Sequence, residues 1–379
     1  MNPLHIDVCE LPEACETLRE EVRQFAKQAM TPYSKLERSH NWTGRDKAFT
    51  KKMAEKGWLG MTWPEKFGGK GRSNLQRYVM LEELLAVGAP MGMHWASDRQ
   101  MGPLLIRYSE DKLAPRLVPE IVCGDTYICI GMSEPDSGSD LASIRTRGTR
   151  VDGGWRISGR KVWTSGAHTA QHMVTLVRTS HDSESRHAGL SQILISLDSP
   201  GVTVRPIMSQ LGTRIFNEVI LDDVFAPDEN LIGEEGHGWQ QVINELKFER
   251  SGPERFLSST QLMLEMLDQA DEENSHQVIA LGKLVARYGV MRQMSQSIAL
   301  LMSEGHDPVL AASIVKDRGA LLEQALPDIA SDLFPDKVGD GSDFDQVLTF
   351  LTLSAPSFSL RGGTREILRG IIARELGLR

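Results

Sequence analysis

The sequence predicts an α+β protein in which an antiparallel β-barrel or sandwich separates two helical segments. Apolar residues recur at helical spacing near both ends of the chain, whereas short runs rich in Val, Ile and Thr fill the middle. Closely spaced strands without helices between them favour antiparallel pairing over a doubly wound sheet. The expected domains are an N-terminal helical domain over 1–125, a β domain over 126–236 and a C-terminal helical domain over 237–379.

The first segment is expected to be helical because its apolar residues follow a 3.6-residue period. In ETLREEVRQFAKQAM, Leu18, Val22, Phe25 and Met30 fall near one face, and YVMLEELLAVG repeats the pattern. Loops rich in Gly, Pro and Lys, such as WPEKFGGKGRSN, join the expected helices.

The middle segment is expected to form strands over WRISGRKVW, HMVTLVRT, LSQILISLD, GVTVRPI and NEVILDDVF. In the third of these, alternate residues from Ile193 to Leu197 point to one side of the sheet and those between them to the other. The stretch VDGGW predicts a hairpin turn. After GEEGHGW the helical pattern returns and continues to the C-terminus.

Composition limits the classes of function. The chain has 379 residues and a formal net charge of −9, which argues against a protein that binds nucleic-acid phosphates. No apolar run approaches the roughly 18 residues that span a bilayer, and the acidic N-terminal stretch resembles no targeting peptide. The 4 cysteines form no CxxC pair and the 10 histidines are scattered, so we expect a cytoplasmic protein without a metal site.

Two stretches of the β segment are candidates for ligand binding. GMSEPDSGSDL, residues 131–141, offers many hydroxyls and free backbone N–H groups, although an ordinary solvated loop has the same composition. In GRKVWTSGA, a Trp followed by two hydroxyl residues suits a planar ligand, or equally a strand packed in the core. The chain has no GxGxxG sequence, so a Rossmann-type nucleotide site is not indicated.

Two stretches of the last segment are also candidates. LRGGTREIL, residues 360–368, places two glycines and a threonine before an expected helix, an arrangement typical of an anion site or of an ordinary helix cap. In GWQQVINELKFERSGPERFL, Glu249 falls on an apolar helix face, where a carboxylate is costly unless it pairs with another helix or takes part in chemistry. Pro253 would end or kink that helix. The residues expected on this face are Val242, Leu246, Glu249, Pro253 and Phe256.

Together these stretches resemble the acyl-CoA dehydrogenase family over nearly the whole chain. GMSEPDSGSDLASIRT is similar to the flavin-binding loop of that family, GRKVWTSGA to its flavin-flanking strand, NEVILDDVFAP to its late β segment and GGTREILRGIIARELGL to its C-terminal helix. The resemblance implies that the chain binds FAD and oxidises acyl-CoA thioesters between the α and β carbons. It also implies an electron-transfer flavoprotein as the electron acceptor.

The resemblance assigns residues to the cofactor. Ile130, Met132 and Ser133 are expected at the polar edge of the flavin ring. Trp163 is expected against the ring, with the two hydroxyl residues after it near N5 and O4, and Ser139 beside the phosphates of the cofactor or of CoA. Thr364 and Glu366 are expected to reach the cofactor from the start of the final helix. The implied cofactor-binding residues are Ile130, Met132, Ser133, Ser139, Trp163, Thr164, Ser165, Thr364 and Glu366.

The catalytic base is also assigned by resemblance. In many family members the position of Gly362 holds a glutamate, which is the base. Members of the isovaleryl and long-chain types instead carry the base in an (L/F)-E-R sequence on the first C-terminal helix, and FER places Glu249 there. The resemblance therefore implies Glu249 as the base, with Ser139, Arg250 and Gly362 contacting the substrate. A glutamate introduced at position 362 is expected to face the same substrate carbon as Glu249.

Two departures from the family pattern concern the adenine end of FAD. The Arg-x-x-Phe-Gly stretch is not recognisable between Glu254 and Arg292, and the Gln-Ile-x-Gly-Gly segment is absent. In the family, the first of these stretches acts across a subunit interface. The expected assembly is thus a homo-oligomer (dimer or tetramer) or a heteromer with a related subunit. The alternative functions are a non-catalytic or half-site subunit, and a flavin monooxygenase or oxidase on the same fold.

Overall fold

The computed structural model describes residues 6–180, 185–247 and 250–378, and the chain divides into two compact units. The helical unit comprises Met1–Arg45, Arg72–Gly92 and Glu249–Arg379, and the sheet unit comprises Asp46–Gly71 and Met93–Phe248. The helices of the N-terminal segment are therefore divided between the two units. The three sequence-based domains with boundaries near residues 125 and 236 stay a prediction.

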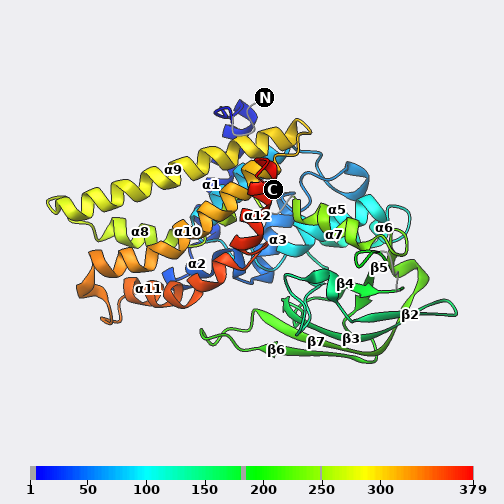
Figure 1. The fold of residues 1–379 in the computed structure, drawn as a ribbon. Coiled ribbons are helices and arrows are strands. Elements are labelled where there is room, and N and C mark those ends of the chain that lie inside the picture. The colour runs from blue at the N-terminus through cyan, green and yellow to red at the C-terminus, as the bar shows by residue number, and fades with distance from the viewer. Residues whose placement is uncertain (1–5, 181–184, 248–249, 379) are drawn as a thin grey trace. The chain divides into compact units, whose positions relative to one another are not determined.

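The helical unit is built on two long helices that pack along each other, α9 and α10, drawn in yellow and orange in Figure 1. Helices α1 and α4 pair, and α4 also packs on α9, whereas α12 packs on α10. The helices of this unit are α1 (Glu13–Ala29), α2 (Lys35–His40), α4 (Asn74–Ala86), α8 (Thr260–Asp268), α9 (Ser275–Ser303), α10 (Val309–Leu333), α11 (Asp343–Ser354) and α12 (Arg365–Glu375).

Local sequence explains why these helices form where they do. The period expected in the first helix is confirmed, because Leu18 and Val22 of α1 are buried. Helix α4 begins at a capping box in which the Ser73 hydroxyl accepts the N–H of Gln76, while the Gln76 side chain accepts the N–H of Ser73.

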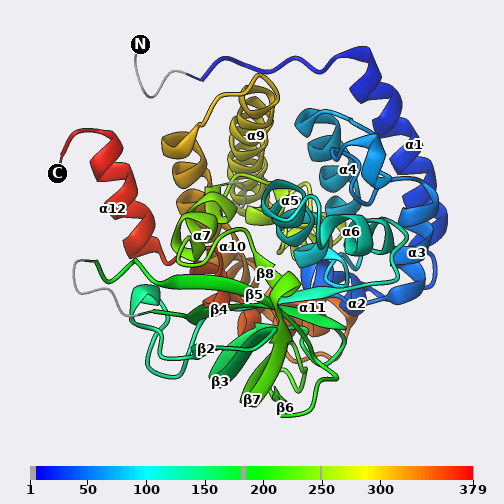
Figure 2. The same cartoon turned by 90° about the vertical axis from the view of Figure 1, so that its right-hand side faces the viewer.

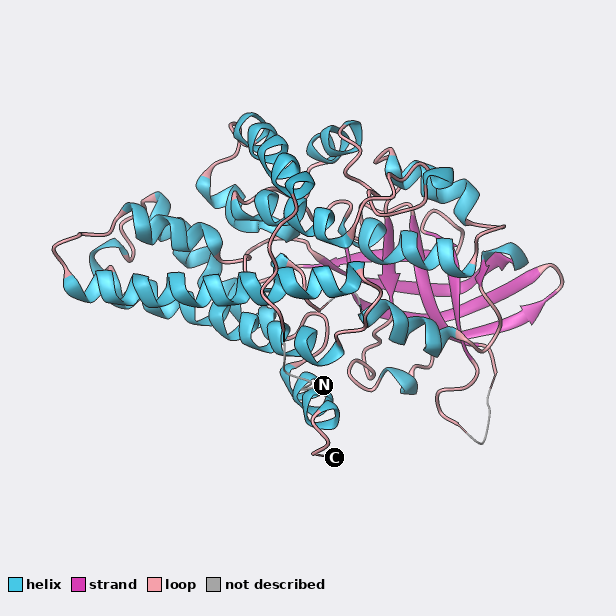
Figure 3. Ribbon diagram, turned by 90° about the horizontal axis from the view of Figure 1, so that it is seen from above, coloured by secondary structure: helices cyan, strands magenta, loops and turns pink. Residues whose placement is uncertain are grey.

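The sheet unit contains one sheet with the strand order β6-β7-β3-β2-β4-β5-β8, and β1 pairs with β4. Figure 2 shows β2, β3, β7 and β6 side by side, and Figure 3 shows the strands in magenta. The strands are β1 (Ile128–Gly131), β2 (Arg147–Val151), β3 (Gly154–Ser165), β4 (His172–Arg178), β5 (Leu190–Ser196), β6 (Val202–Ile207), β7 (Phe216–Pro227) and β8 (Leu231–Ile232). The helices of this unit are α3 (Lys47–Glu55), α5 (Gly102–Tyr108), α6 (Ala114–Val122) and α7 (Gly238–Lys247).

The expectation of a closed antiparallel barrel is wrong, although a sandwich-like packing fits. The described strands end at β6 on one side and β8 on the other, so the sheet does not close. Strand β1 runs parallel to β4, and β2 meets β4 through one parallel pair, whereas the other ladders are antiparallel. The β2–β3 hairpin lies between β1 and β4 in the sequence, and this long crossover allows the parallel pairing.

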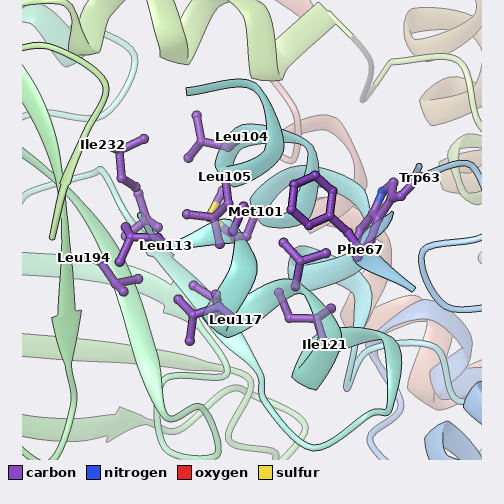
Figure 4. Packing of buried hydrophobic residues seen from close by; sticks show 14 residues of the cluster. Trp63, Phe67, Met101, Leu104, Leu105, Leu113, Leu117, Ile121, Leu194 and Ile232 are labelled. Atoms are coloured by element: carbon purple, nitrogen blue, oxygen red, sulfur yellow. The ribbon is translucent and has the colours of Figure 1, made fainter. Parts of the chain in front are cut away.

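Strands β4 and β5 are buried on both faces. Met173 and Ile193 point into a core cluster formed by the strands. Val174 and Leu194, one residue later, point to the opposite face and pack against α5, α6 and the loop that carries Trp63 (Figure 4). The alternation expected from Ile193 onward is confirmed, and helices cover the second face as well.

The hairpin expected from VDGGW is also confirmed. Val151 of β2 pairs with Gly154 of β3, so Asp152 and Gly153 form the two-residue turn. Gly153 has φ 71°, a left-handed conformation that favours glycine.

Membrane-spanning helices and metal-binding clusters are both absent from the described residues. None of their helices is long and apolar enough to cross a membrane. None of their His, Cys, Asp and Glu side chains form a group of three or more that could hold a metal ion.

Candidate active site

The loop over residues 131–141 is attached to the end of β3 by two hydrogen bonds. The backbone N–H of Val162 donates to the carbonyl of Ser133 at 2.9 Å, and the Lys161 ammonium donates to the carbonyl of Met132 at 3.0 Å. Ile130 precedes this attachment at the end of β1. The structure therefore brings three sequence-predicted residues, Ile130, Met132 and Ser133, beside the strand that carries Trp163.

Trp163 is presented outward from an irregular point in the sheet. The β3–β7 register shifts between Lys161 and Thr164, and Trp163 has φ 60°, which is unusual for a non-glycine residue. Its side chain is 58% exposed. The Phe216 ring makes a T-shaped contact with it, with 6.0 Å between the two ring centroids. An indole with so much free surface is available to a flat ligand.

The two hydroxyl residues after Trp163 lie on opposite sides of the strand. Ser165 is exposed like Trp163, whereas Thr164 is 1% exposed and its hydroxyl has no hydrogen-bond partner among the described residues. The side-chain amide of Asn217 donates to the carbonyl of Thr164 at 2.9 Å and holds the strand end. Ser165 thus shares the outward side of Trp163, and Thr164 faces inward.

Ser139 lies in the exposed, distal part of the same loop. There the loop is held by its own polar groups, because the Ser137 hydroxyl donates to the carbonyl of Asp140 at 2.6 Å and the Asp140 carboxylate pairs with Arg186. Ser139 therefore has the solvent access that contact with a phosphate requires.

Sequence reasoning missed a buried ion pair behind the loop. The Lys161 ammonium lies 2.9 Å from Oε1 of Glu134, and neither side chain is more than 7% exposed. Burial lowers the pKa of Lys161 to about 8, and the attraction of Glu134 opposes this. Burial alone would raise the pKa of Glu134, but Lys161 and hydrogen bonds to residues 145–146 outweigh it and lower that pKa. The available signal was the strand period, which places Lys161 in phase with buried Trp155 and Ile157.

In the helical unit, Thr364 serves as a helix cap. Its hydroxyl accepts the N–H of Ile367 at 3.4 Å at the start of α12. Glu366 is exposed, and hydrogen bonds from its own N–H and from the Thr364 hydroxyl lower its pKa. Arg365 pairs with Asp317 of α10 at 2.7 Å. The glycine-rich loop thus shows the features of an ordinary helix cap.

Gly362 lies beside buried cationic side chains. A β-carbon at this position would lie 3.3 Å from Nη2 of Arg255 and 3.3 Å from Cε of Lys316, whose side chains are both buried. Next to it, Arg361 donates to Glu323 at 2.5 Å and lies over the Trp42 ring, 4.6 Å from its centroid. In α10, Lys316 and Glu323 recur at helical spacing with the apolar residues Ala312, Ala320 and Leu326, and this spacing was the sequence signal for their burial.

Glu249 lies outside the described residues. The expected single helical face from Val242 to Phe256 is not observed, because α7 ends at Lys247 and the next helical segment is a 3₁₀ turn over Pro253–Arg255. Pro253 explains the break, since proline lacks the N–H that a continuing helix requires. Arg250 is partly buried.

The family assignment rests on comparisons with known proteins. The chain matches the acyl-CoA dehydrogenase N-terminal domain over residues 12–125 and the acyl-CoA dehydrogenase middle domain over residues 129–224. The acyl-CoA dehydrogenase IpdE1 of Mycobacterium tuberculosis (strain ATCC 25618 / H37Rv) is 33% identical over 356 residues, covering 90% of this chain and 90% of that protein. The chain belongs to the acyl-CoA dehydrogenase family.

Two further relatives extend the comparison. The acyl-CoA dehydrogenase FadE34 of the same organism is 32% identical over 332 residues, which cover 86% of this chain and 45% of that protein. The chain thus spans less than half of the length of FadE34. A chain in the crystal structure of the ChsE4–ChsE5 complex from Mycobacterium tuberculosis has a TM-score of 0.83 at 26% identity, covering 98% of this chain and 99% of that one.

The acyl-CoA dehydrogenase family is one of oxidoreductases, and its members are generally flavoproteins that bind FAD. The residues of the sheet unit fit such a cofactor. An exposed indole, an exposed hydroxyl at Ser165 and the attached loop at Met132 and Ser133 provide a flat apolar surface with polar groups at its margin. A tricyclic ring with a polar edge has the complementary chemistry.

Proposed function

We propose that the chain catalyses the FAD-dependent α,β-dehydrogenation of an acyl-CoA thioester to the 2-enoyl-CoA. The observation that supports this most strongly is the exposed Trp163 ring, on a strand that is hydrogen-bonded to the 131–141 loop, in a member of the acyl-CoA dehydrogenase family. When bound, FAD supplies the hydride acceptor, and the protein orients the reactants and controls the protons.

The proposed cofactor-binding residues are those that the family resemblance assigns. In the sheet unit, the backbone near Ile130 and Met132, together with Ser133, borders the ring, Trp163 lies against it, and the 164–165 segment faces its N5 and O4 side. Ser139 is proposed at a phosphate of FAD or CoA. In the helical unit, Thr364 and Glu366 are proposed as further cofactor contacts, in addition to the cap that Thr364 provides.

Glu249 is proposed as the base that removes the α-proton of the substrate. The sequence places it among apolar residues, and burial raises the pKa of a carboxyl group toward the range useful to a base. The backbone N–H of Gly362 is proposed to donate to the thioester oxygen, which stabilises the charge that develops there. Arg250 and Ser139 are proposed as further contacts for acyl-CoA.

Absorbance measurements test this function. The purified protein should be yellow, with FAD that is non-covalent and present at partial occupancy, because the adenine-side segments of the family are missing. Addition of an acyl-CoA that is a substrate should, under anaerobic conditions, bleach the visible flavin band.

We further propose a cytoplasmic enzyme of three domains that passes electrons to an electron-transfer flavoprotein.

A second candidate is a half-site or non-catalytic subunit of a heteromeric acyl-CoA dehydrogenase. Two observations favour it: the missing adenine-side segments, and the similarity to a chain of the ChsE4–ChsE5 complex. This candidate predicts that the isolated chain binds little FAD and that co-expression with a related subunit from the same genome restores binding. A homo-oligomer with one FAD per chain would exclude it.

A further inference from the structure

A buried ion pair joins three separate segments of the sheet unit. Lys161 of β3 and Glu134 of the 131–141 loop lie 2.9 Å apart, and the Lys161 side chain is entirely buried. Their pairing connects the loop to the strand that carries Trp163. Neither residue has a role in the proposed chemistry.

Glu134 fixes the far side of the loop. Its Oε2 accepts the N–H of Arg145 at 2.7 Å, and its Oε1 accepts the N–H of Thr146 at 2.9 Å. The backbone of Glu134 also exchanges two hydrogen bonds with Ser137, at 2.7 and 3.1 Å. One carboxylate therefore holds the segment that follows the loop and the loop itself at the same point.

Lys161 fixes the near side of the loop, two residues before Trp163. Its ammonium donates to the carbonyl of Met132 at 3.0 Å, and the next residue donates to the carbonyl of Ser133. The β3–β7 ladder shifts register at this point, so the loop supplies hydrogen bonds where the ladder is irregular. The left-handed backbone of Trp163 is costly and persists only where its surroundings determine it.

Gly131, where the loop begins, packs closely against Met173 and Lys161. A β-carbon at Gly131 would lie 2.6 Å from Sδ of Met173 and 3.3 Å from Cγ of Lys161, so the loop begins in direct contact with the lysine stem. A buried ion pair adds little net stability, because desolvation of the two charges offsets their attraction. Its effect is to select one geometry among those that an apolar contact would allow.

We infer that Lys161 and Glu134 are positioning residues for the flavin ring, which hold the Trp163 face and the Met132–Ser133 backbone in one arrangement before the cofactor binds. This inference rests on the proposed function, since it names FAD as the ligand. The pair acts through Trp163 and the loop and does not contact the ring. Its loss disorders the ring site while the rest of the sheet unit keeps its fold.

The test uses Lys161→Met, which keeps the stem, and the double variant Lys161→Met/Glu134→Gln, which leaves no unpaired buried charge. Arg160→Met is the matched control, because Arg160 precedes Lys161 on β3 and makes an exposed pair with Glu218. Each protein is made with fluorotryptophan, and the Trp163 resonance is assigned by its absence in Trp163→Phe. The measurements are the fluorine spectrum without FAD, the dissociation constant for FAD, and urea unfolding.

The wild type and Arg160→Met should each give one narrow Trp163 resonance and similar FAD affinity. The two Lys161 variants should give a broad or split Trp163 resonance and bind FAD at least about tenfold more weakly, the scale seen when a residue that orients direct ligands is lost. The double variant should unfold as cooperatively as the wild type. A double variant with a single narrow Trp163 resonance and unchanged FAD affinity would overturn the inference.

The resonance separates the two proposals. If the wild type binds no FAD at all, the proposed function fails, but the Trp163 resonance of the apo-protein still tests the ion pair. If the wild type binds FAD and bleaches with acyl-CoA while the Lys161 variants match it in both readouts, the proposed function stands and the positioning role is refuted.

Discussion

At the scale of single residues, the proposed proton transfer depends on Glu249. Glu249→Gln keeps the shape of the side chain and removes its basicity. FAD binding should be unchanged, and turnover should fall by roughly 10²-fold or more, the usual scale for a lost general base. Stopped-flow measurement of flavin reduction by the preferred acyl-CoA gives this rate. Near-normal turnover would make Glu249 a structural residue.

Gly362 is the position where other family members hold the base, and the structure argues against a base at this position here. A non-glycine residue at φ 65° is strained by about 1–2 kcal/mol, and a carboxylate there would lie next to the Arg255 guanidinium and the Lys316 ammonium. These cations would lower its pKa and make it a poor base. We expect that Gly362→Glu does not restore turnover to Glu249→Gln.

Gly362→Gln in the same background is the control, because it carries equal bulk and strain without charge. We expect the Glu variant to be as inactive as the Gln variant. If only the Glu variant recovers turnover, Arg255 and Lys316 do not lower the pKa of a carboxylate at position 362 enough to prevent it from acting as a base.

The Lys161–Glu134 pair predicts a pH dependence of FAD binding. Burial lowers the pKa of Lys161 to about 8, against 10.5 for a free lysine, so the ion pair is intact below pH 8 and is lost above it. FAD affinity should therefore fall between about pH 7 and about pH 9. In Lys161→Met this step should be absent.

As pH rises, Lys161 should change the free energy of unfolding in the opposite sense to its effect on FAD affinity. Between about pH 8 and 10.5 the unfolded chain binds more protons at Lys161 than the folded chain does, so the contribution of Lys161 to stability rises with pH. Parallel urea unfolding and FAD titrations distinguish a local effect at the ring site from unfolding. A loss of stability that tracks the loss of FAD would contradict the assignment to Lys161.

Residues differ in how far the sequence alone locates them. Trp163 and Ser133 were found because a loop and a strand resemble known flavin-binding stretches. Lys161 was overlooked because a lysine between strand residues is usually read as exposed, although its phase with Trp155 indicated burial. The cations beside Gly362 come from distant segments, and no local pattern reports such an approach.

At the scale of elements, the last helix tests whether Thr364 acts as a cap. The Thr364 hydroxyl accepts the N–H of Ile367, so Thr364→Ala should destabilise α12 by about 1 kcal/mol, whereas Thr364→Ser should keep most of the cap. Hydrogen exchange of the α12 amides in the absence of FAD measures this directly. If the α12 amides of Thr364→Ala are protected as in the wild type, the hydroxyl does not stabilise α12, and contact with the cofactor is its only proposed role.

Elements were predicted from local periodicity, and the errors arise where periodicity is not enough. The alternation in β5 and the Asp152–Gly153 turn follow from two-residue spacing and turn chemistry, and the structure has both. The parallel pairing of β1 and the open ends of the sheet depend on which distant strands meet. The apolar pattern runs on to Phe256, but the helix ends before Pro253, as the missing N–H of that proline predicts.

At the scale of the whole molecule, we predict that cofactor binding and assembly are linked. In the family a stretch near the adenine end of FAD acts across a subunit interface, so the chain should form at least a dimer, with itself or with a related subunit. Sedimentation over a range of concentrations, with FAD content measured at each, tests this. A monomer that retains FAD at low concentration would contradict it.

The central claim is that this chain is an FAD-dependent acyl-CoA dehydrogenase, and anaerobic titration of the purified protein with a panel of acyl-CoAs tests it most directly. We predict a yellow protein whose visible flavin band is bleached by at least one acyl-CoA and not by free CoA. The bleaching should be fast in the wild type and slow in Glu249→Gln. A protein that takes up no FAD, alone or with a related subunit, would contradict the claim, and so would a flavin that no acyl-CoA reduces.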